Sequence, residues 1–311
     1  MKIAFFTEGN IGGKVARNYT NMRTDMAWLA TLNADRIPYY EVNQVTERYD
    51  LGICIIPKRL DLNPTINIDL IKTKCNKVCS MQEGPHWVFQ DYQLPQQIWF
   101  YNILQDMDFL FVHNKIDKKY FEGLTGKECK LLPTLMIEDS IKQLPEVTRT
   151  GVMIGGNFCS WYGGFDSYMI AQEFEEQVFI PSMGRKINGE EQMQNLNHLP
   201  YMEWSQWINE LNKCKYGIHL MRTHAAGTFA LNCAYLGIPC IGYEGLDTQM
   251  TCHPDCTIEL GNLSQAKQIA KKLRKDEEFY LYCSNIAKEN YKNYYHEDKF
   301  NNTFKEQLKI S

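Results

Sequence analysis

The sequence has no apolar run that approaches the ~20 residues of a membrane-spanning helix. Its first apolar segment, Ile3 to Phe6, is too short for the core of a signal peptide and is followed by Thr7-Glu8-Gly9. Internal repeats and low-complexity runs are also missing from the 311 residues. These absences predict a globular protein of the cytoplasm.

A strong excess of charge of one sign is missing as well. The chain has 33 Lys and Arg residues and 37 Asp and Glu residues, which gives a formal net charge of −4. This balance argues against a protein whose whole surface binds polyanions such as nucleic acids. It is compatible with a local basic cleft, because binding depends on where the charges are placed.

The eleven cysteines lack the pattern of a disulfide framework. Several lie inside apolar segments, as Cys54, Cys79 and Cys240 do, and are expected to be reduced thiols of the core. The segment Cys252 to Cys256 contains three types of zinc ligand, but the second pair that a structural zinc site needs is missing. We therefore expect no metal site.

Apolar segments alternate with segments of helical pattern, an order typical of an α/β protein with parallel sheets. The expected strands are 2–8, 37–42, 51–57, 77–81, 109–113, 151–157, 178–182, 217–221, 239–243 and 256–260. The expected helices include 66–71, 99–105, 117–124 and 229–236, with a helical remainder from Leu263. A chain of 311 residues can form two domains, and the polar, proline-containing segment 133–150 is the expected link.

The segment Tyr216 to Glu244 contains the strongest candidate for a ligand site. An expected strand, 217–221, is followed by a polar loop, 222–228, and by an expected helix, 229–236, which Gly237 ends. In a parallel sheet such a loop lies at the carboxyl edge, where ligands bind and where a helix N-terminus attracts anions. The alternative is an ordinary strand-helix-strand unit without a ligand.

Two further groups of candidates follow expected strands of the first half. Gly12 and Gly13 come after the first strand and can bring backbone N–H groups close to a phosphate, unless this is a plain surface loop. Glu83 and His86 follow the strand 77–81, and Asp91 lies nearby, so these three are candidates for acid-base catalysis. The alternatives are a structural histidine and a helix-capping glutamate.

The segment Leu231 to Pro239, LNCAYLGIP, resembles the LEA-x-A-x-G-x-P signature of nucleotide-sugar glycosyltransferases of the GT-B fold, especially the retaining family 4. In that family, glutamates stand at the positions of Asn232 and His224. The resemblance implies two facing Rossmann-like domains with parallel sheets and a cleft between them. The implied domains are 1–140 on the acceptor side and 141–290 on the donor side, with a terminal helix in 291–311 that crosses back to the first domain.

The resemblance also implies roles for the candidate residues. The donor is then a nucleotide sugar, UDP-linked, which is a substrate and not a cofactor. In this interpretation His86 corresponds to a family histidine near the acceptor and the sugar, and His224 lies near the sugar. The remaining candidates bind the donor. Gly227, Thr228 and Phe229 provide N–H groups at the phosphates, Asn232 binds hydroxyls, and Tyr201 lies at the nucleobase unless it is a core residue. Asn157, Arg185 with Lys186, and Arg222 stand where the family has a cationic clamp.

The acceptor is less defined by the sequence. Asn18 to Trp28 loosely resembles the start of bacteriophage glycosyltransferases that modify hydroxymethylated DNA bases, which would place the chain in a host cytoplasm. A flipped base would then lie against cationic and aromatic side chains, for which the candidates are Lys14, Arg17, Arg23, Trp87 and Trp161. The alternatives are a saccharide or small-molecule acceptor, a nucleotide-sugar epimerase, and a binder without activity. Family 4 implies retention of configuration, whereas a histidine or carboxylate base favours inversion.

Overall fold

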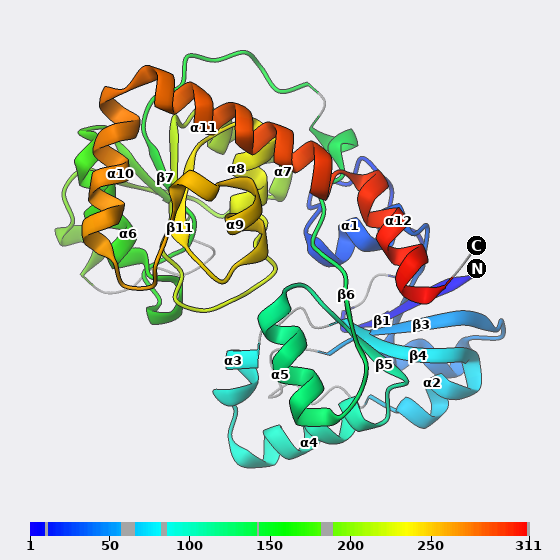
Figure 1. The fold of residues 1–311 in the computed structure, drawn as a ribbon. Coiled ribbons are helices and arrows are strands. Elements are labelled where there is room, and N and C mark those ends of the chain that lie inside the picture. The colour runs from blue at the N-terminus through cyan, green and yellow to red at the C-terminus, as the bar shows by residue number, and fades with distance from the viewer. Residues whose placement is uncertain (10–11, 57–65, 82–85, 142, 182–188, 310–311) are drawn as a thin grey trace. The chain divides into compact units, whose positions relative to one another are not determined.

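The computed structural model describes residues 1–9, 12–56, 66–81, 86–141, 143–181 and 189–309. They form two compact units (Figure 1). Unit 1 contains Met1–Tyr19, Arg23–Ile137 and Glu297–Ser311, and unit 2 contains Thr20–Met22 and Glu138–His296. The chain therefore leaves unit 1 for most of unit 2 and returns to it for its last helix.

Unit 1 is built on a sheet of six parallel strands in the order β2-β1-β3-β4-β5-β6. The strands are β1 (Ile3–Thr7), β2 (Asp35–Pro38), β3 (Tyr49–Ile55), β4 (Cys75–Met81), β5 (Phe109–Val112) and β6 (Cys129–Leu131). The helices are α1 (Thr24–Thr31), α2 (Ile68–Lys74), α3 (His86–Gln90), α4 (Leu94–Gln105), α5 (Lys115–Thr125) and α12 (Glu297–Leu308). Because all strands are parallel, their carboxyl ends meet at one edge of the sheet.

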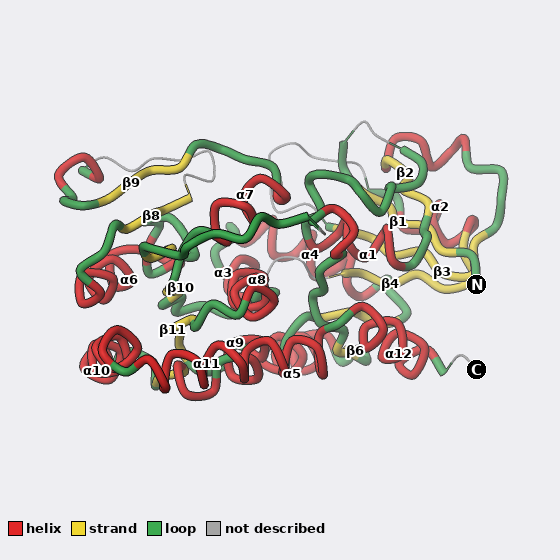
Figure 2. Tube along the Cα trace, turned by 90° about the horizontal axis from the view of Figure 1, so that it is seen from above, coloured by secondary structure: helices red, strands yellow, loops and turns green. Residues whose placement is uncertain are grey.

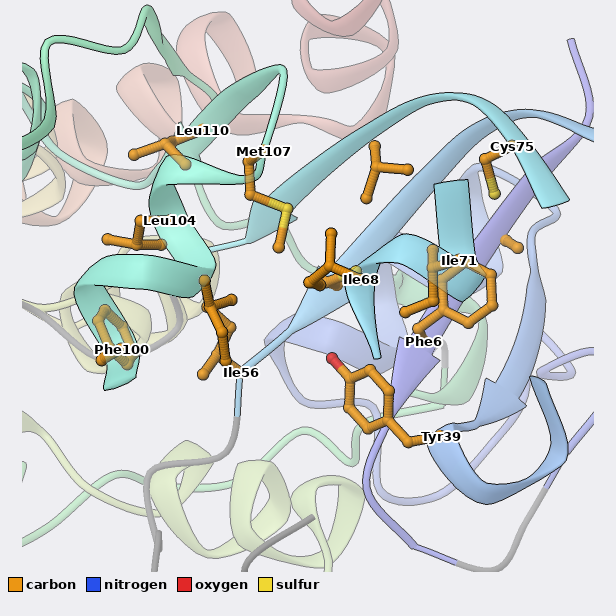
Figure 3. Packing of buried hydrophobic residues seen from close by; sticks show 14 of the residues in the cluster. Phe6, Tyr39, Ile56, Ile68, Ile71, Cys75, Phe100, Leu104, Met107 and Leu110 are labelled. Atoms are coloured by element: carbon orange, nitrogen blue, oxygen red, sulfur yellow. The ribbon is translucent and has the colours of Figure 1, made fainter. Parts of the chain in front are cut away.

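Alternate side chains of these strands enter two apolar layers. One layer contains residues of β1, α2, α4 and their neighbours, among them Phe6, Ile68, Ile71, Phe100 and Leu104 (Figure 3). On the other face, the ring of Trp28 in α1 lies 5.6 Å from Phe111 and 5.2 Å from Phe300 of α12. The last helix is thus part of the core of unit 1.

The expected strand 37–42 is wrong in its position and its length. β2 ends at Pro38, and a 3-10 helix, η1 (Tyr39–Gln44), follows it. Proline has no N–H group to continue a ladder, so it suits the end of an edge strand. The apolar residues of η1 still enter the core, because Tyr39 and Val42 are buried.

Unit 2 is built on a second sheet of six parallel strands, in the order β12-β11-β10-β7-β8-β9. The strands are β7 (Val152–Ile154), β8 (Val178–Pro181), β9 (Leu196–Leu199), β10 (Tyr216–His219), β11 (Cys240–Tyr243) and β12 (Thr257–Ile258). The chain runs outward from β7 to β9 and then returns to place β10 on the other side of β7. The strand order therefore reverses between β7 and β10, the point at which doubly wound sheets bind ligands.

Helices cover both faces of the second sheet. They are α6 (Gly164–Ala171), α7 (Trp204–Asn212), α8 (Thr228–Leu236), α9 (Asp247–Cys252), α10 (Leu263–Lys275) and α11 (Glu277–Asn290), with short 3-10 turns, and a π-helix, η8 (Tyr291–Tyr295), follows α11. Figure 2 shows α6 and α10 on one side of β10 and β11, and α7 and α8 on the other. Tyr216 and Ile218 of β10 pack toward α6 and α10, so the residues that alternate with them, Gly217 and His219, face α8.

All eleven cysteines are free and buried, as expected from their positions in apolar segments. No described helix has the length and apolar character needed to cross a membrane.

Candidate functional site

A backbone hydrogen bond joins the carboxyl ends of β7 and β10, and a side chain of α6 binds the residue that follows β10. The N–H of Gly155 donates to the carbonyl of Ile218 over 2.8 Å, and the N–H of Leu220 donates to Ser167 Oγ over 3.0 Å. Gly163 has a φ of +61°, and a Cβ there would lie 1.9 Å from the carbonyl oxygen of Leu220. This glycine is required on two grounds, left-handed backbone and close approach. The strand-order reversal of unit 2 is therefore a closely packed place.

The N-terminus of α8 lies directly after this point and has no side-chain cap. Gly227 precedes the helix with a φ of +75°, and within the described residues no side-chain hydrogen bond caps the helix. The hydroxyl of Thr248 donates to the Gly227 carbonyl over 3.0 Å, and a Cβ at Gly227 would lie 2.0 Å from that hydroxyl oxygen. Thr228 is exposed at the first helical position. The first N–H groups of α8 and their partial positive charge are thus available to an anion.

Two asparagines predicted to bind the donor are buried in unit 2. Asn157 is 1% exposed; its Oδ1 accepts from the Cys159 N–H over 3.0 Å, and its Nδ2 has no hydrogen-bond partner among the described residues. Asn232 is 4% exposed on α8. An unpaired buried amide costs free energy, so the Nδ2 of Asn157 is a buried donor whose hydrogen bond is not made within the described residues.

The loop between β10 and α8 carries two more predicted residues. Arg222 is exposed, and its Nη2 lies 2.7 Å from Asp166 Oδ2, which raises the pKa of the guanidinium further. The ring of His224 lies against Gly245, where a Cβ would be 2.2 Å from His224 Nε2. The imidazole of His224 can therefore lie here only because residue 245 has no side chain. Both side chains belong to the same edge as Asn157.

His219 is a buried histidine at the end of β10 that the sequence analysis did not single out. Its ring lies 5.3 Å from the ring of Phe229 and 6.4 Å from that of Tyr162. Neither ring nitrogen has a hydrogen-bond partner among the residues described. Burial lowers its pKa to about 4, so the imidazole is neutral at neutral pH.

In unit 1, the carboxyl edge brings together a histidine and a carboxylate. His86 starts α3, after β4, and its Nδ1 lies 2.7 Å from Asp117 Oδ1 on α5. The same oxygen accepts from the backbone N–H of His86 over 3.0 Å. The side chain of Asp117 is 2% exposed and that of His86 is 19% exposed. A buried carboxylate thus holds His86 by two hydrogen bonds, one to its backbone N–H and one to its partly accessible imidazole.

Other residues of α5 hold this pair in place. Asn114 caps the helix, its Nδ2 donates to Asp117 Oδ2 over 2.7 Å, and its Oδ1 accepts from the Asp117 N–H over 2.8 Å. The ring of Tyr120, one turn further, lies 4.8 Å from the imidazole of His86. The position of Asp117 in the first turn of a helix also stabilises its negative charge.

Other predicted residues of unit 1 lie elsewhere on it. The N–H of Gly13 donates to the Arg36 carbonyl over 2.8 Å, and Gly12 has the same carbonyl oxygen 3.4 Å from its Cβ position. Lys14 pairs with Asp35 at 3.1 Å, and Arg17 pairs with Glu297 at 2.7 Å. Asp91 is exposed after the last residue of α3, at the end opposite His86.

The last predicted residues lie in loops or outside the described part of the chain. Glu83, Arg185 and Lys186 lie outside the described residues. Tyr201 is 57% exposed in the loop between β9 and α7. Groups of three or more His, Cys, Asp or Glu side chains suited to a metal ion do not occur in the part of the chain that the structure describes.

Asp117 is the functional candidate that sequence reasoning missed. Its position in sequence could have indicated a role, because Asn114 and Asp117 follow the end of β5. An asparagine cap followed by an acidic residue in the first helical turn is, however, also common where it only stabilises the helix. His219 was missed because it ends an apolar strand.

Comparisons with known proteins agree with this architecture. No family model and no curated protein sequence matches the chain. Among solved structures, HepE from Anabaena in complex with UDP and glucose has a TM-score of 0.68 at 11% identity, with 99% of each chain covered. Sucrose-phosphate synthase from Thermosynechococcus elongatus has a TM-score of 0.72 at 10% identity, covering 99% of this chain and 98% of that one. WaaG, a glycosyltransferase of lipopolysaccharide biosynthesis, has a TM-score of 0.61 at 11% identity, with 99% of each chain covered.

The chain has the GT-B fold. The likeness extends over nearly the whole length of this chain and of these three structures, so both six-stranded sheets are included. The predicted fold class, α/β with two parallel sheets of the GT-B type, is confirmed. At 10% to 11% identity, this likeness establishes the fold alone. The chemistry has to be argued from the residues at the carboxyl edges of the two sheets.

Proposed function

We propose that this protein is a glycosyltransferase that moves a hexosyl or pentosyl group from a nucleotide sugar, UDP-linked, to an acceptor hydroxyl. The observation that carries the proposal is the uncapped N-terminus of α8 beside the strand-order reversal of unit 2. Such a terminus offers N–H groups and positive charge to a diphosphate. The complexes of HepE with UDP and with UDP-glucose support this ligand class.

Unit 2 provides the groups that a nucleoside diphosphate needs. The N–H groups of Gly227, Thr228 and Phe229 face the phosphates, the Nδ2 of Asn157 adds a neutral donor, and Arg222 adds a cation. Asn232 serves the ribose hydroxyls, His224 the sugar and Tyr201 the nucleobase. As the bond from the sugar to the diphosphate breaks, negative charge grows on the leaving oxygen. Fixed dipoles and a cation at that place lower the barrier.

The acceptor side is assigned to unit 1, where Glu83, His86 and Asp91 are the candidates. A hydroxymethylated DNA base stays a prediction for the acceptor, next to saccharides and small molecules. An epimerase would instead change the donor without any acceptor, and a pure binder would hold it unchanged.

One assay separates these activities. The full chain is incubated with a panel of nucleotide sugars, with saccharide acceptors, with hydroxymethylated DNA, and with no acceptor, and mass spectrometry follows release of the nucleoside diphosphate. Transfer that needs an acceptor supports the proposal. Conversion of the donor alone supports the epimerase, and binding without any turnover supports the binder.

The site itself is tested with Thr228→Glu and its control Thr228→Gln. A carboxylate in the first turn of α8 competes with the phosphates, so calorimetry should show a dissociation constant for UDP raised about tenfold in Thr228→Glu, which corresponds to ~1.4 kcal/mol. The helix itself gains from a negative charge there, so the melting temperature should not fall. Equal UDP affinity in both variants would remove the N-terminus of α8 from the site.

A further inference from the structure

A pair of cysteines in unit 2 joins the segment before β12 to α11. Cys256 ends a 3-10 helix, η7 (Pro254–Cys256), and its side chain hydrogen-bonds to that of Cys283 on α11. The preceding residue, Asp255, hydrogen-bonds in the same way to Tyr282. Both cysteines belong to one buried apolar cluster. Two consecutive residues of each segment thus face each other, and the two thiols are in contact.

The backbone on both sides of this contact is held by other bonds. The N–H of Cys256 donates to the carbonyl of His253 over 3.0 Å. Next to Cys283, the hydroxyl of Ser284 donates to the carbonyl of Gly237 over 2.6 Å and so fixes α11 against the end of α8. A disulfide requires two fixed backbone positions whose side chains point toward each other. The thiol contact and these bonds meet that requirement.

The two thiols are not equivalent. The pKa of Cys283 is lowered, first by the hydrogen bond from Cys256 and also by the charge of Lys272, although burial and Asp255 act in the opposite direction. The ammonium group of Lys272 lies 3.8 Å from the ring centre of Phe279, which is one turn before Cys283 on α11. The same hydrogen bond and burial raise the pKa of Cys256. Cys283 therefore carries the thiolate, and Cys256 stays protonated beside it.

Other thiols of unit 2 lack this combination. Cys233 and Cys240 also form a hydrogen-bonded pair, but both are 0% exposed, and burial raises the pKa of Cys240. Burial likewise raises the pKa of Cys252 to about 12. Cys283, by contrast, is 5% exposed. Oxidants select thiols that are accessible and ionised and that have a second thiol nearby.

We infer that Cys283 and Cys256 form a redox couple that a hydroperoxide converts into a disulfide. With hydrogen peroxide, the Cys283 thiolate attacks one oxygen, a sulfur–oxygen bond forms, and the oxygen–oxygen bond breaks. The hydroxide that leaves takes up a proton from solvent. The sulfur of Cys256 then attacks the sulfenic acid on Cys283, the sulfur–sulfur bond forms, and the sulfur–oxygen bond breaks. The hydroxyl leaves as water with the thiol proton of Cys256.

The balance of this reaction is two thiols and one peroxide to one disulfide and two waters, with two electrons passing from sulfur to oxygen. The product links η7 to α11 covalently. A thiol reductant reverses it by thiol–disulfide exchange. The site is thus a reversible modification site, and it is independent of the proposed sugar transfer.

The first test maps the link in the wild-type chain. Reduced full-length protein is treated with hydrogen peroxide, its remaining thiols are alkylated, and a digest without reductant is read by mass spectrometry. A peptide pair joined through Cys256 and Cys283 should form at least about tenfold faster than one joined through Cys233 and Cys240, because ionisation and access both favour it. Dithiothreitol should remove it. Absence of this link, or equal rates for the two pairs, would overturn the inference.

The second test concerns the order of the steps. In Cys256→Ser, peroxide should leave a sulfenic acid on Cys283 that dimedone labels, whereas in Cys283→Ser no label should appear on Cys256. Cys252→Ser, the same change at a buried thiol outside the pair, is the matched control and should keep the wild-type link. Label on Cys256 in place of Cys283 would contradict the assigned roles.

A third measurement needs no variant. In urea the contact between η7 and α11 is lost, so the preference for the link between Cys256 and Cys283 over other cysteine pairs should disappear. The same preference in folded and unfolded protein would show that the fold does not create the site, and the inference would fall.

Discussion

The carboxyl edges of the two sheets are stabilised by different kinds of contact. In unit 1, the edge holds polar side chains in fixed places through charge and hydrogen bonds, with Asp117 at the centre. In unit 2, the edge is fixed by the close packing of glycine residues, with Gly163 against the backbone of Leu220 and Gly227 against the side chain of Thr248. The first construction suits proton transfer, and the second suits close approach of a phosphate to N–H groups.

The histidines of the two edges show the same contrast. His86 is oriented by a carboxylate and partly exposed, whereas His219 has aromatic neighbours and no hydrogen-bond partner among the residues described. One imidazole is oriented by a carboxylate, and burial keeps the other neutral by lowering its pKa to about 4. Equivalent places in two similar sheets thus differ in the chemistry that they permit.

The largest expected effect comes from Gly163→Ala. The methyl group would meet the Leu220 carbonyl oxygen at 1.9 Å, and the φ of +61° adds strain. We expect the free energy of unfolding to fall by about 3 kcal/mol or more, as the sum of the two costs. Urea denaturation measures this loss.

The control is Gly126→Ala, at the C-terminal cap of α5 in unit 1. Its φ of +68° is similar, but a Cβ there meets nothing within 4 Å. Only the backbone cost of about 1 kcal/mol is expected. Similar losses in the two variants would show that the edge of unit 2 is not held by this contact.

The second prediction concerns acid. Burial lowers the pKa of both His219 and His253 to about 4, whereas an unfolded histidine titrates near 6.5. Between these values the unfolded chain binds more protons, so stability is lost as the pH falls below about 6.5. At pH 5 each histidine should cost about 2 kcal/mol relative to pH 7.5.

A substitution isolates the share of His219. In His219→Phe, whose ring suits neighbours such as Phe229, the loss between pH 7.5 and 5 should shrink by about 2 kcal/mol. The measurement is urea denaturation of both proteins at both pH values, which cancels the contribution of other titrating groups. An unchanged pH dependence would mean that the ring accepts a proton without cost in the folded state.

Local sequence features predicted much of the fold. Strands such as β10 and β11 are short apolar runs between breakers, because both faces of a parallel sheet are covered. Gly237, at a φ of +67°, ends α8 where the helical pattern predicted its end. The wrong strand 37–42 shows the limit, since its apolar residues fit a strand or a 3-10 turn equally well and only Pro38 carried the distinction.

The candidate site depends more on contacts between distant residues. The residues of the loop between β10 and α8 were found because loop and helix are neighbours in sequence. The contact of His86 with Asp117 joins residues 31 positions apart, and the fit of Gly163 to Leu220 joins two loops. Neither has a local signature, because each partner has an ordinary role in its own segment.

The smallest of these effects is expected for Arg222→Ala, which tests whether charge adds to the packed edge of unit 2. Arg222 is 62% exposed and pairs with Asp166, so the pair itself adds little to stability. If the guanidinium also contacts the phosphates, calorimetry should give a dissociation constant for UDP raised about tenfold, or ~1.4 kcal/mol. This difference should shrink in high salt, because exposed charges are screened. Asp166→Asn is the matched control: it breaks the same ion pair but leaves the cation, so its UDP affinity should be at least that of the wild type. Equal weakening in both variants would assign Arg222 to the ion pair alone.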